Sequence, residues 1–230
     1  MRIALLAAVF VSAPALAQSA NEVAAQAALN ELIPPPGSKA VAGLALAELQ
    51  KDARAKSECV PTTVTLAPIK PASATRLAID GMKRRLMRNA WSVVAMPQGC
   101  PSPLPVRIAV VLLGNDELVV LPYATGDSIA WVSLVGDAKQ NIASVTFAAL
   151  AARNPDWKCS QTDPVVLEKL TMAGNATGLG PDFYGVRYTG SWQEIWTFSM
   201  CRRKIDVPVT FTADGNGGAY WKATAAPGAK

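Results

Sequence analysis

Two ten-residue stretches, WSVVAMPQGC at residues 91–100 and WQEIWTFSMC at residues 192–201, have the same spacing between a tryptophan and a cysteine. They lie 101 residues apart, and the same offset places three further identical pairs in register: Val106 with Val207, Gly114 with Gly215, and Asn115 with Asn216. Cys59 and Cys159 are 100 residues apart, one short of this register. A self-match at a long fixed spacing is typical of a duplicated unit. The alternative is a single β-rich domain with coincidental spacing.

The first seventeen residues have the features of an export signal. Arg2 provides a positive charge, residues 3–11 (IALLAAVFV) are apolar but too few to span a bilayer, and Pro14 precedes the small-residue site Ala15-Leu16-Ala17. This order predicts a signal peptide at residues 1–17 and a mature chain that begins at Gln18. No later run approaches the roughly 18 apolar residues of a membrane span. We expect a soluble protein, periplasmic or secreted, with no transmembrane span.

Export determines how the four cysteines are interpreted. In an oxidising compartment an even number of cysteines indicates disulfides, and four cysteines allow three pairings. The 101-residue offset favours two of the possible bridges, Cys59–Cys100 and Cys159–Cys201. The chain has no C-x-x-C pair and no histidine, so neither a metal site nor a cofactor is predicted.

Helix signals precede strand signals in both halves of the chain. A capping box at Ser19 and Glu22 opens a helix that the prolines at 34–36 end, and further helices are predicted at 38–55, with Leu44, Ala45 and Leu49 buried, and at 142–152. The fold class is therefore α+β: two similar tandem units, each a helix packed on an antiparallel β-meander and stapled by one disulfide. The boundaries are a signal peptide at 1–17, a helix and Pro-rich linker at 18–37, and units at 38–133 and 134–230.

The strands are predicted from β-branched and alternating segments. They lie at 62–66, 106–110 and 118–123 in the first unit and at 207–211 and 219–222 in the second, with glycine-containing turns at 114–116 and 214–218. Residues 76–89 are ambiguous. One possibility is a helix with Lys83, Arg84, Arg85 and Arg88 on its solvent-exposed face. Comparison with residues 182–192 instead favours a strand, a turn and a strand over residues 86–96.

The charge of the chain limits its partners. The formal charge is +5, and loss of Arg2 with the signal leaves +4, which is far from the basic faces of nucleic-acid-binding proteins. We expect no nucleic acid as partner and consider an envelope protein or an anionic glycan. The cluster at 83–88 and the run Arg202, Arg203 and Lys204 are candidates for an anion-binding surface, and a plain solvated face is the alternative.

Glu194 lies between Trp192 and Trp196, so the carboxylate and both indoles should project from one face of a strand. Aromatic rings beside a carboxylate can bind a sugar or a cation, which makes these three residues, with Arg202 and Arg203, the candidate ligand-binding set. The alternative is a structural role, with an exposed glutamate beside two half-buried tryptophans.

The segment from Ser191 to Gly218 has the pattern W-x-E-x-W…C…V-x-V-x-F-x-x-D-x-x-G-G. Over about thirty residues it resembles small exported proteobacterial proteins, most of which have no assigned function. It departs from them where they often carry Cys-Gly, because Arg202 follows Cys201 here. The resemblance implies an envelope or secreted setting and identifies no catalytic residue.

Several reaction classes are excluded by composition. Without histidine there is no Ser-His-Asp or Cys-His nucleophile, and the chain has no G-x-S-x-G elbow or S-x-x-K pair. We therefore predict a non-catalytic binding or accessory module rather than an enzyme. Two alternatives stay open: a cell-wall glycan hydrolase with paired carboxylates, which leave no local signature, and a structural subunit of a secreted assembly.

We predict that the exported protein begins at Gln18 and contains two disulfides and no free thiol, because the cleavage site and the even cysteine count agree. Intact mass before and after reduction and alkylation measures both. A free thiol in protein purified from the envelope would contradict the predicted compartment.

Overall fold

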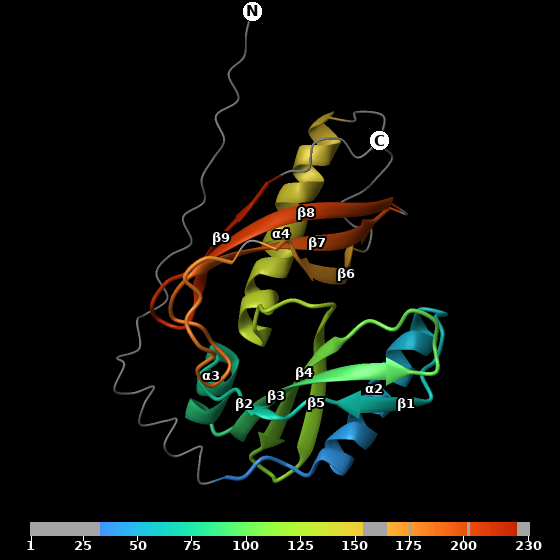
Figure 1. Ribbon diagram of the computed structural model, residues 1–230, viewed down its shortest axis with the longest axis vertical. Coiled ribbons are helices and arrows are strands. Elements are labelled where there is room, and N and C mark those ends of the chain that lie inside the picture. The colour runs from blue at the N-terminus through green and yellow to red at the C-terminus, as the bar shows by residue number, and fades with distance from the viewer. Residues whose placement is uncertain (1–32, 154–164, 175, 202, 225–230) are drawn as a thin grey trace, which may run out of the picture.

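Along the chain a helix is followed by an antiparallel sheet, and this order occurs twice (Figure 1). The computed structural model describes residues 33–153, 165–174, 176–201 and 203–224. In the first half, helix α2 (Ser38–Ala55) precedes strands β1 (Thr63–Leu66), β3 (Met87–Gln98), β4 (Val106–Leu113) and β5 (Leu118–Thr125). In the second half, helix α4 (Val132–Arg153) precedes strands β6 (Val165–Met172), β7 (Ser191–Met200), β8 (Arg203–Ala213) and β9 (Ala219–Ala223). The α+β class is confirmed.

The first sheet has the strand order β1-β3-β4-β5, and the short strand β2 (Lys70–Pro71) also pairs with β3. Helix α2 has the bounds expected from the sequence and buries a stripe with a spacing of four residues: Val41, Ala45, Leu49 and Ala53. Leu44, predicted to be buried, is 38 % exposed because the stripe follows Val41 instead. The stripe packs on the alternate residues of β3 and β4 that face it, among them Trp91, Val93, Ile108 and Val110.

Residues 76–98 resolve the ambiguity in the sequence. The helix considered for residues 76–89 is present as α3 (Arg76–Lys83), whereas the strand, turn and strand predicted over residues 86–96 are replaced by the uninterrupted strand β3. The Thr75 hydroxyl caps α3 by accepting a hydrogen bond from the Ala78 amide at 3.3 Å. Strand β3 continues without a turn because it pairs with β4 from Met87 to Ala95. The basic side chains at 83–85 and 88 are exposed.

The second sheet has the order β6-β7-β8-β9, and α4 packs against it. Burial alternates strictly along β7, so its even-numbered side chains enter the core. Trp192 stacks on Phe211 of β8, with ring centroids 5.1 Å apart. Helix α4 begins ten residues before the predicted helix at 142–152. Within the described ranges, no helix combines the length and apolarity needed to cross a membrane.

The pairing of β3, β4 and β5 matches that of β7, β8 and β9 when 101 is added to the residue numbers of the first sheet. Trp91 pairs with Val110, and Trp192 pairs with Phe211. The next pairs correspond as well, Val110 with Val120 and Phe211 with Trp221. The correspondence ends at the first strand, since Ala95 pairs with Leu66 but Trp196 pairs with Leu170 rather than residue 167. A bulge at residues 167–169 contributes to this shift.

The predicted bridge between Cys59 and Cys100 is present. It joins the segment after α2 to the turn after β3 and closes a loop with a sequence separation of 41. The other predicted bridge involves Cys159, which lies outside the described residues. Among the residues that the structure describes, no cysteine has a free thiol.

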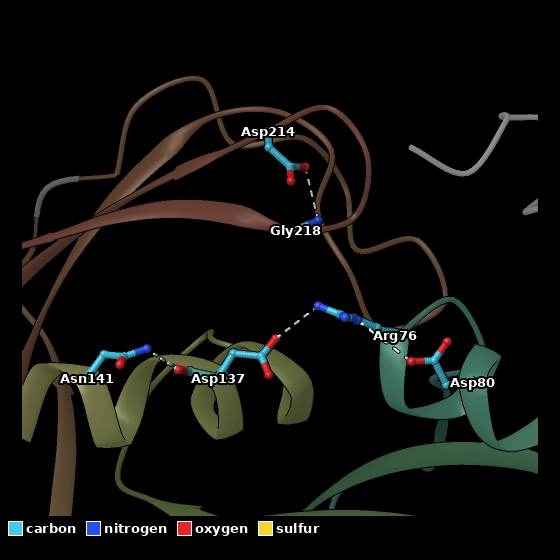
Figure 2. A network of polar contacts seen from close by, with 6 residues as sticks. All are labelled: Arg76, Asp80, Asp137, Asn141, Asp214 and Gly218. Atoms are coloured by element: carbon cyan, nitrogen blue, oxygen red, sulfur yellow. Dashed lines mark hydrogen bonds and ion pairs between the residues drawn. The ribbon is translucent and has the colours of Figure 1, made fainter. Parts of the chain in front are cut away.

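The two halves contact each other through short segments. Gly126, directly after β5, forms a parallel bridge with Leu170 of β6, and a side chain at Gly126 would place a Cβ 2.0 Å from the Leu170 oxygen. Arg76 of α3 lies between Asp80 of the same helix and Asp137 of α4, at 3.7 and 3.9 Å (Figure 2). These exposed ion pairs contribute little, about 0–1 kcal/mol each, so the close backbone contact at Gly126 is the stronger constraint.

Replacing both Cys59 and Cys100 by serine should lower the free energy of unfolding by about 4 kcal/mol, the loop-closure value for a bridge of this span. Chemical denaturation of the oxidised double variant beside the wild type measures the difference. A loss below about 1 kcal/mol would show that the bridge contributes little to the first half.

Candidate functional site

Trp192, Glu194 and Trp196 share one face of β7, as the alternation of a strand predicts. That face is the inner one, and the three side chains are 1 %, 0 % and 0 % exposed. The tryptophans are therefore more deeply buried than the structural alternative supposed, and the glutamate is buried rather than exposed. We call these three residues, with the loop at 128–130, the Glu194 cluster.

Five donors surround the Glu194 carboxylate. Trp192 Nε1 donates to Oε1 at 3.1 Å and Trp196 Nε1 donates to Oε2 at 2.9 Å. The Ser128 hydroxyl lies 2.9 and 3.0 Å from the two oxygens. The backbone amides of Ile129 and Ala130 complete the set at 3.0 and 3.2 Å from Oε1. Every one of these contacts comes from an N–H or O–H group, so the carboxylate acts here purely as an acceptor.

The backbone donors come from the segment that leads into α4. The Trp131 carbonyl accepts the first helical hydrogen bond, from the Val135 amide, so the amides of residues 129 and 130 lie just before the helix. A carboxylate at this position interacts favourably with the positive end of the helix dipole. Glu194 therefore fixes where α4 begins and how it sits on the second sheet.

Ser128 also connects the cluster to the first half. Its carbonyl oxygen accepts a hydrogen bond from Arg107 Nη1 at 2.5 Å, while its hydroxyl donates to Glu194. Arg107 belongs to β4, so one residue links a strand of the first sheet to a strand of the second. Ser128 is itself fully buried.

This geometry determines what Glu194 can do chemically. A general acid or a nucleophile must contact its substrate, and the Glu194 side chain has no exposed surface and both oxygens occupied. Its surroundings lend no support to the glycan-hydrolase alternative. The carboxylate is instead a packing element that satisfies two buried indoles and two amides.

The other acid of the W-x-E-x-W…D-x-x-G-G pattern is also engaged internally. Asp214 Oδ1 accepts hydrogen bonds from the amides of Asn216 at 2.7 Å and Gly218 at 3.0 Å, which closes the turn between β8 and β9 (Figure 2). The neighbouring Tyr188 hydroxyl is buried and has no hydrogen-bond partner among the described residues. Burial raises the pKa of this phenol, and the Asp214 charge raises it further.

Among the predicted ligand-binding residues that the structure describes, Arg203 lies apart from Trp192, Glu194 and Trp196. Arg203 is exposed at the start of β8, opposite Met200, and Arg202 lies outside the described residues. The adjacent Lys204 forms an ion pair with Glu168 at 2.6 Å, and that hydrogen bond raises the pKa of the lysine. In the other basic cluster, Arg88 pairs with Asp116. The described side chains of both basic segments are exposed to solvent.

A groove that the sequence did not reveal lies between α4 and the β6 side of the second sheet. Its volume is about 650 Å³. It is lined on the helix by Gly136, Lys139, Gln140, Ala143, Ser144 and Phe147, and on the sheet by Val165 and Phe198. These helix positions recur every three or four residues and so form one face. We call this feature the α4–β6 groove.

The groove runs beside an edge strand. β6 is the outer strand of its sheet, and its contacts on the free side are at its C-terminal end, where Leu170 bridges Gly126 and the Met172 amide donates to Asp127. Across residues 165–169, the described part of the chain provides no backbone partner on that side. An edge with unused N–H and C=O groups can pair with another strand.

Sequence reasoning missed the groove for an identifiable reason. The predicted helix started at residue 142, so Gly136, Lys139 and Gln140 were not assigned to any helix face. The recurrence of small and polar residues at 136, 139, 140, 143 and 144 was the available signal.

Within the described ranges, no group of three or more His, Cys, Asp or Glu side chains is placed to hold a metal ion.

Comparison with known proteins provides no further assignment. No protein-family model, no curated protein and no solved structure matches the chain.

Glu194→Gln should lower the free energy of unfolding by about 2–4 kcal/mol. The amide NH₂ would face N–H donors, and each buried donor left unpaired costs about 1–3 kcal/mol. Glu168→Gln is the matched control, since that acid is partly exposed and should change stability by less than about 1 kcal/mol. Equal stability of the two variants in chemical denaturation would refute the role assigned to Glu194.

Proposed function

We propose that this protein is an exported, non-catalytic binding module whose α4–β6 groove takes an extended segment of another envelope protein. The observation that carries the proposal is the open groove of about 650 Å³ beside the edge strand β6, whose residues 165–169 have no backbone partner on the outer side in the described part of the chain. A concave surface of this size lies in the range of ligand sites. The free edge supplies backbone hydrogen-bonding groups in the same place.

The mode of binding follows from this combination. An extended segment that pairs with β6 would add a strand to the second sheet, with the main chain providing affinity. Every second side chain of that segment would then enter the groove, where Ala143, Phe147 and Val165 offer apolar contacts. Alternating apolar side chains are therefore the expected pattern of the partner.

Charge and the placement of the aromatic rings favour a peptide over a glycan. Lys139 is the charged residue among the groove-lining side chains, and it suits an acidic group on the partner. Sugars commonly stack on exposed aromatic rings. Trp91, Trp131, Trp192 and Trp196 are buried, and the exposed rings of Phe183 and Tyr220 do not line the groove. We therefore favour an envelope protein with an acidic, partly apolar segment over an anionic glycan.

Two observations support export. The Cys59–Cys100 bridge is of the kind that persists in oxidising compartments. Residues 1–17 carry the charge, the apolar run and the cleavage site of a signal peptide in the expected order. A periplasmic or secreted setting agrees with both.

We further infer that the two halves are tandem copies of one unit. The support is the shared register of three strands at an offset of 101 residues, together with the helix that precedes each sheet. The copies have diverged in the segment before their second long strand, where the first half has β2 and α3 and the second has the shifted strand β6.

Ser144→Arg places a long side chain in the groove from its exposed side. The variant should lower recovery of the partner from native envelope extracts at least about tenfold, which corresponds to a loss of about 1.4 kcal/mol in binding free energy. Val145→Arg is the matched control, because residue 145 is 49 % exposed on the same helix and does not line the groove. Recovery is measured with the tagged full-length mature chain.

A second readout tests the strand addition itself. When the partner is bound, amide hydrogen exchange should slow at residues 165–169 of the β6 edge. Separately, Lys139→Glu should weaken capture of a partner with an acidic segment, because it reverses the charge in the groove. Undiminished capture by folded Ser144→Arg, or recovery of glycan instead of protein, would overturn the proposal.

A further inference from the structure

A small cavity lies where the two halves meet, beside Ile129. Its volume is about 20 Å³, which is room for about one particle the size of a water molecule. Its walls come from β3, β4, β5, the start of α3, the start of α4 and the loop at 182–187. We call it the junction cavity.

Two partly buried arginines line the junction cavity. Arg107 Nε donates to the Tyr123 hydroxyl at 3.1 Å, and its Nη1 donates to the Ser128 carbonyl. Arg187 Nη1 donates to the Gly180 carbonyl. All three acceptors are neutral oxygens. Each guanidinium has five N–H donors, so several donors of both side chains remain for another acceptor.

Neither arginine has an anionic partner in the part of the chain that the structure describes, since no carboxylate lies within 4.0 Å of either guanidinium. Partly buried charges are normally paired, because water no longer compensates them fully. Glu194 does not itself line the cavity, and its oxygens accept from their own donors, one of which is the amide of the lining residue Ile129.

The remaining lining groups differ in sign. Helix α3 begins at the cavity through Thr75 and has no acidic residue in its first turn, whereas the start of α4 already faces Glu194. The single acid of the lining is Asp182, which is exposed and whose Oδ1 accepts the Gly185 amide at 2.9 Å. Counted over the lining side chains alone, two arginines and one aspartate give a net charge of +1.

We propose that the junction cavity binds a monatomic anion, with chloride the abundant candidate outside the cell. Chloride is similar in size to water and so suits the cavity. One negative charge would neutralise the lining, and the Tyr123 hydroxyl, which accepts from Arg107, has its own proton left to donate. The ion would join β4 of the first half to the loop at 182–187 of the second.

The test is chloride-dependent unfolding of the full mature chain. Sodium chloride is compared with sodium gluconate at equal ionic strength, since gluconate does not fit the cavity and general screening is matched. The folded-to-unfolded ratio should rise about tenfold once chloride reaches roughly ten times its dissociation constant. Arg187→Gln should abolish this rise, and Arg203→Gln, which removes the same charge from an exposed site, should retain it.

Crystals grown in bromide provide a readout that needs no variant. An anomalous peak between the Arg107 and Arg187 guanidiniums supports the proposal. Equal stability of the wild type in both salts overturns it, as does a chloride effect that survives Arg187→Gln. Bromide peaks confined to the outer surface, an adventitious ion only, also overturn it.

Discussion

A carboxylate removed from water must find donors inside the protein, because an uncompensated buried charge costs several kcal/mol. Glu194 finds five, and they come from two places that are far apart in the sequence: the indoles of its own strand and the loop at 128–130. That loop follows the last strand of the first sheet directly. The connection between the halves, the start of α4 and the second core therefore depend on one side chain.

The same dependence explains where the binding surface lies. The Glu194 cluster holds the start of α4. The helix packs on the buried aromatic side chains of the second sheet and leaves a groove beside β6. The residues that looked most suited to ligand contact are used for packing. The residues left open to a partner, such as Lys139 and Ser144, are ordinary in type and are recognisable only by their place on the helix.

Local signals predicted much of the fold. The limits of α2, the alternating strands and the turns follow from periodicity and turn residues, although no side chain caps α2, whose N-cap is Gly37. The Cys59–Cys100 bridge follows from the 101-residue offset, since cysteine number alone leaves three pairings. Residues 76–86 could not be resolved, because a short helix capped by Thr75 and a strand pair have similar local patterns. The burial of Glu194 was beyond local reasoning, since three of its donors are more than sixty residues away.

In the shared register, Glu194 stands opposite Val209 where the first sheet pairs Val93 with Ile108. A glutamate placed at such a valine position without donors would cost an amount comparable to the net stability of a small domain, about 5–10 kcal/mol. Under the proposed duplication, the two copies can differ in this way only because the donors differ as well. An acid at this position requires the indoles of Trp192 and Trp196 and the loop at 128–130, so the donors and the acid can be exchanged between the copies only as a set.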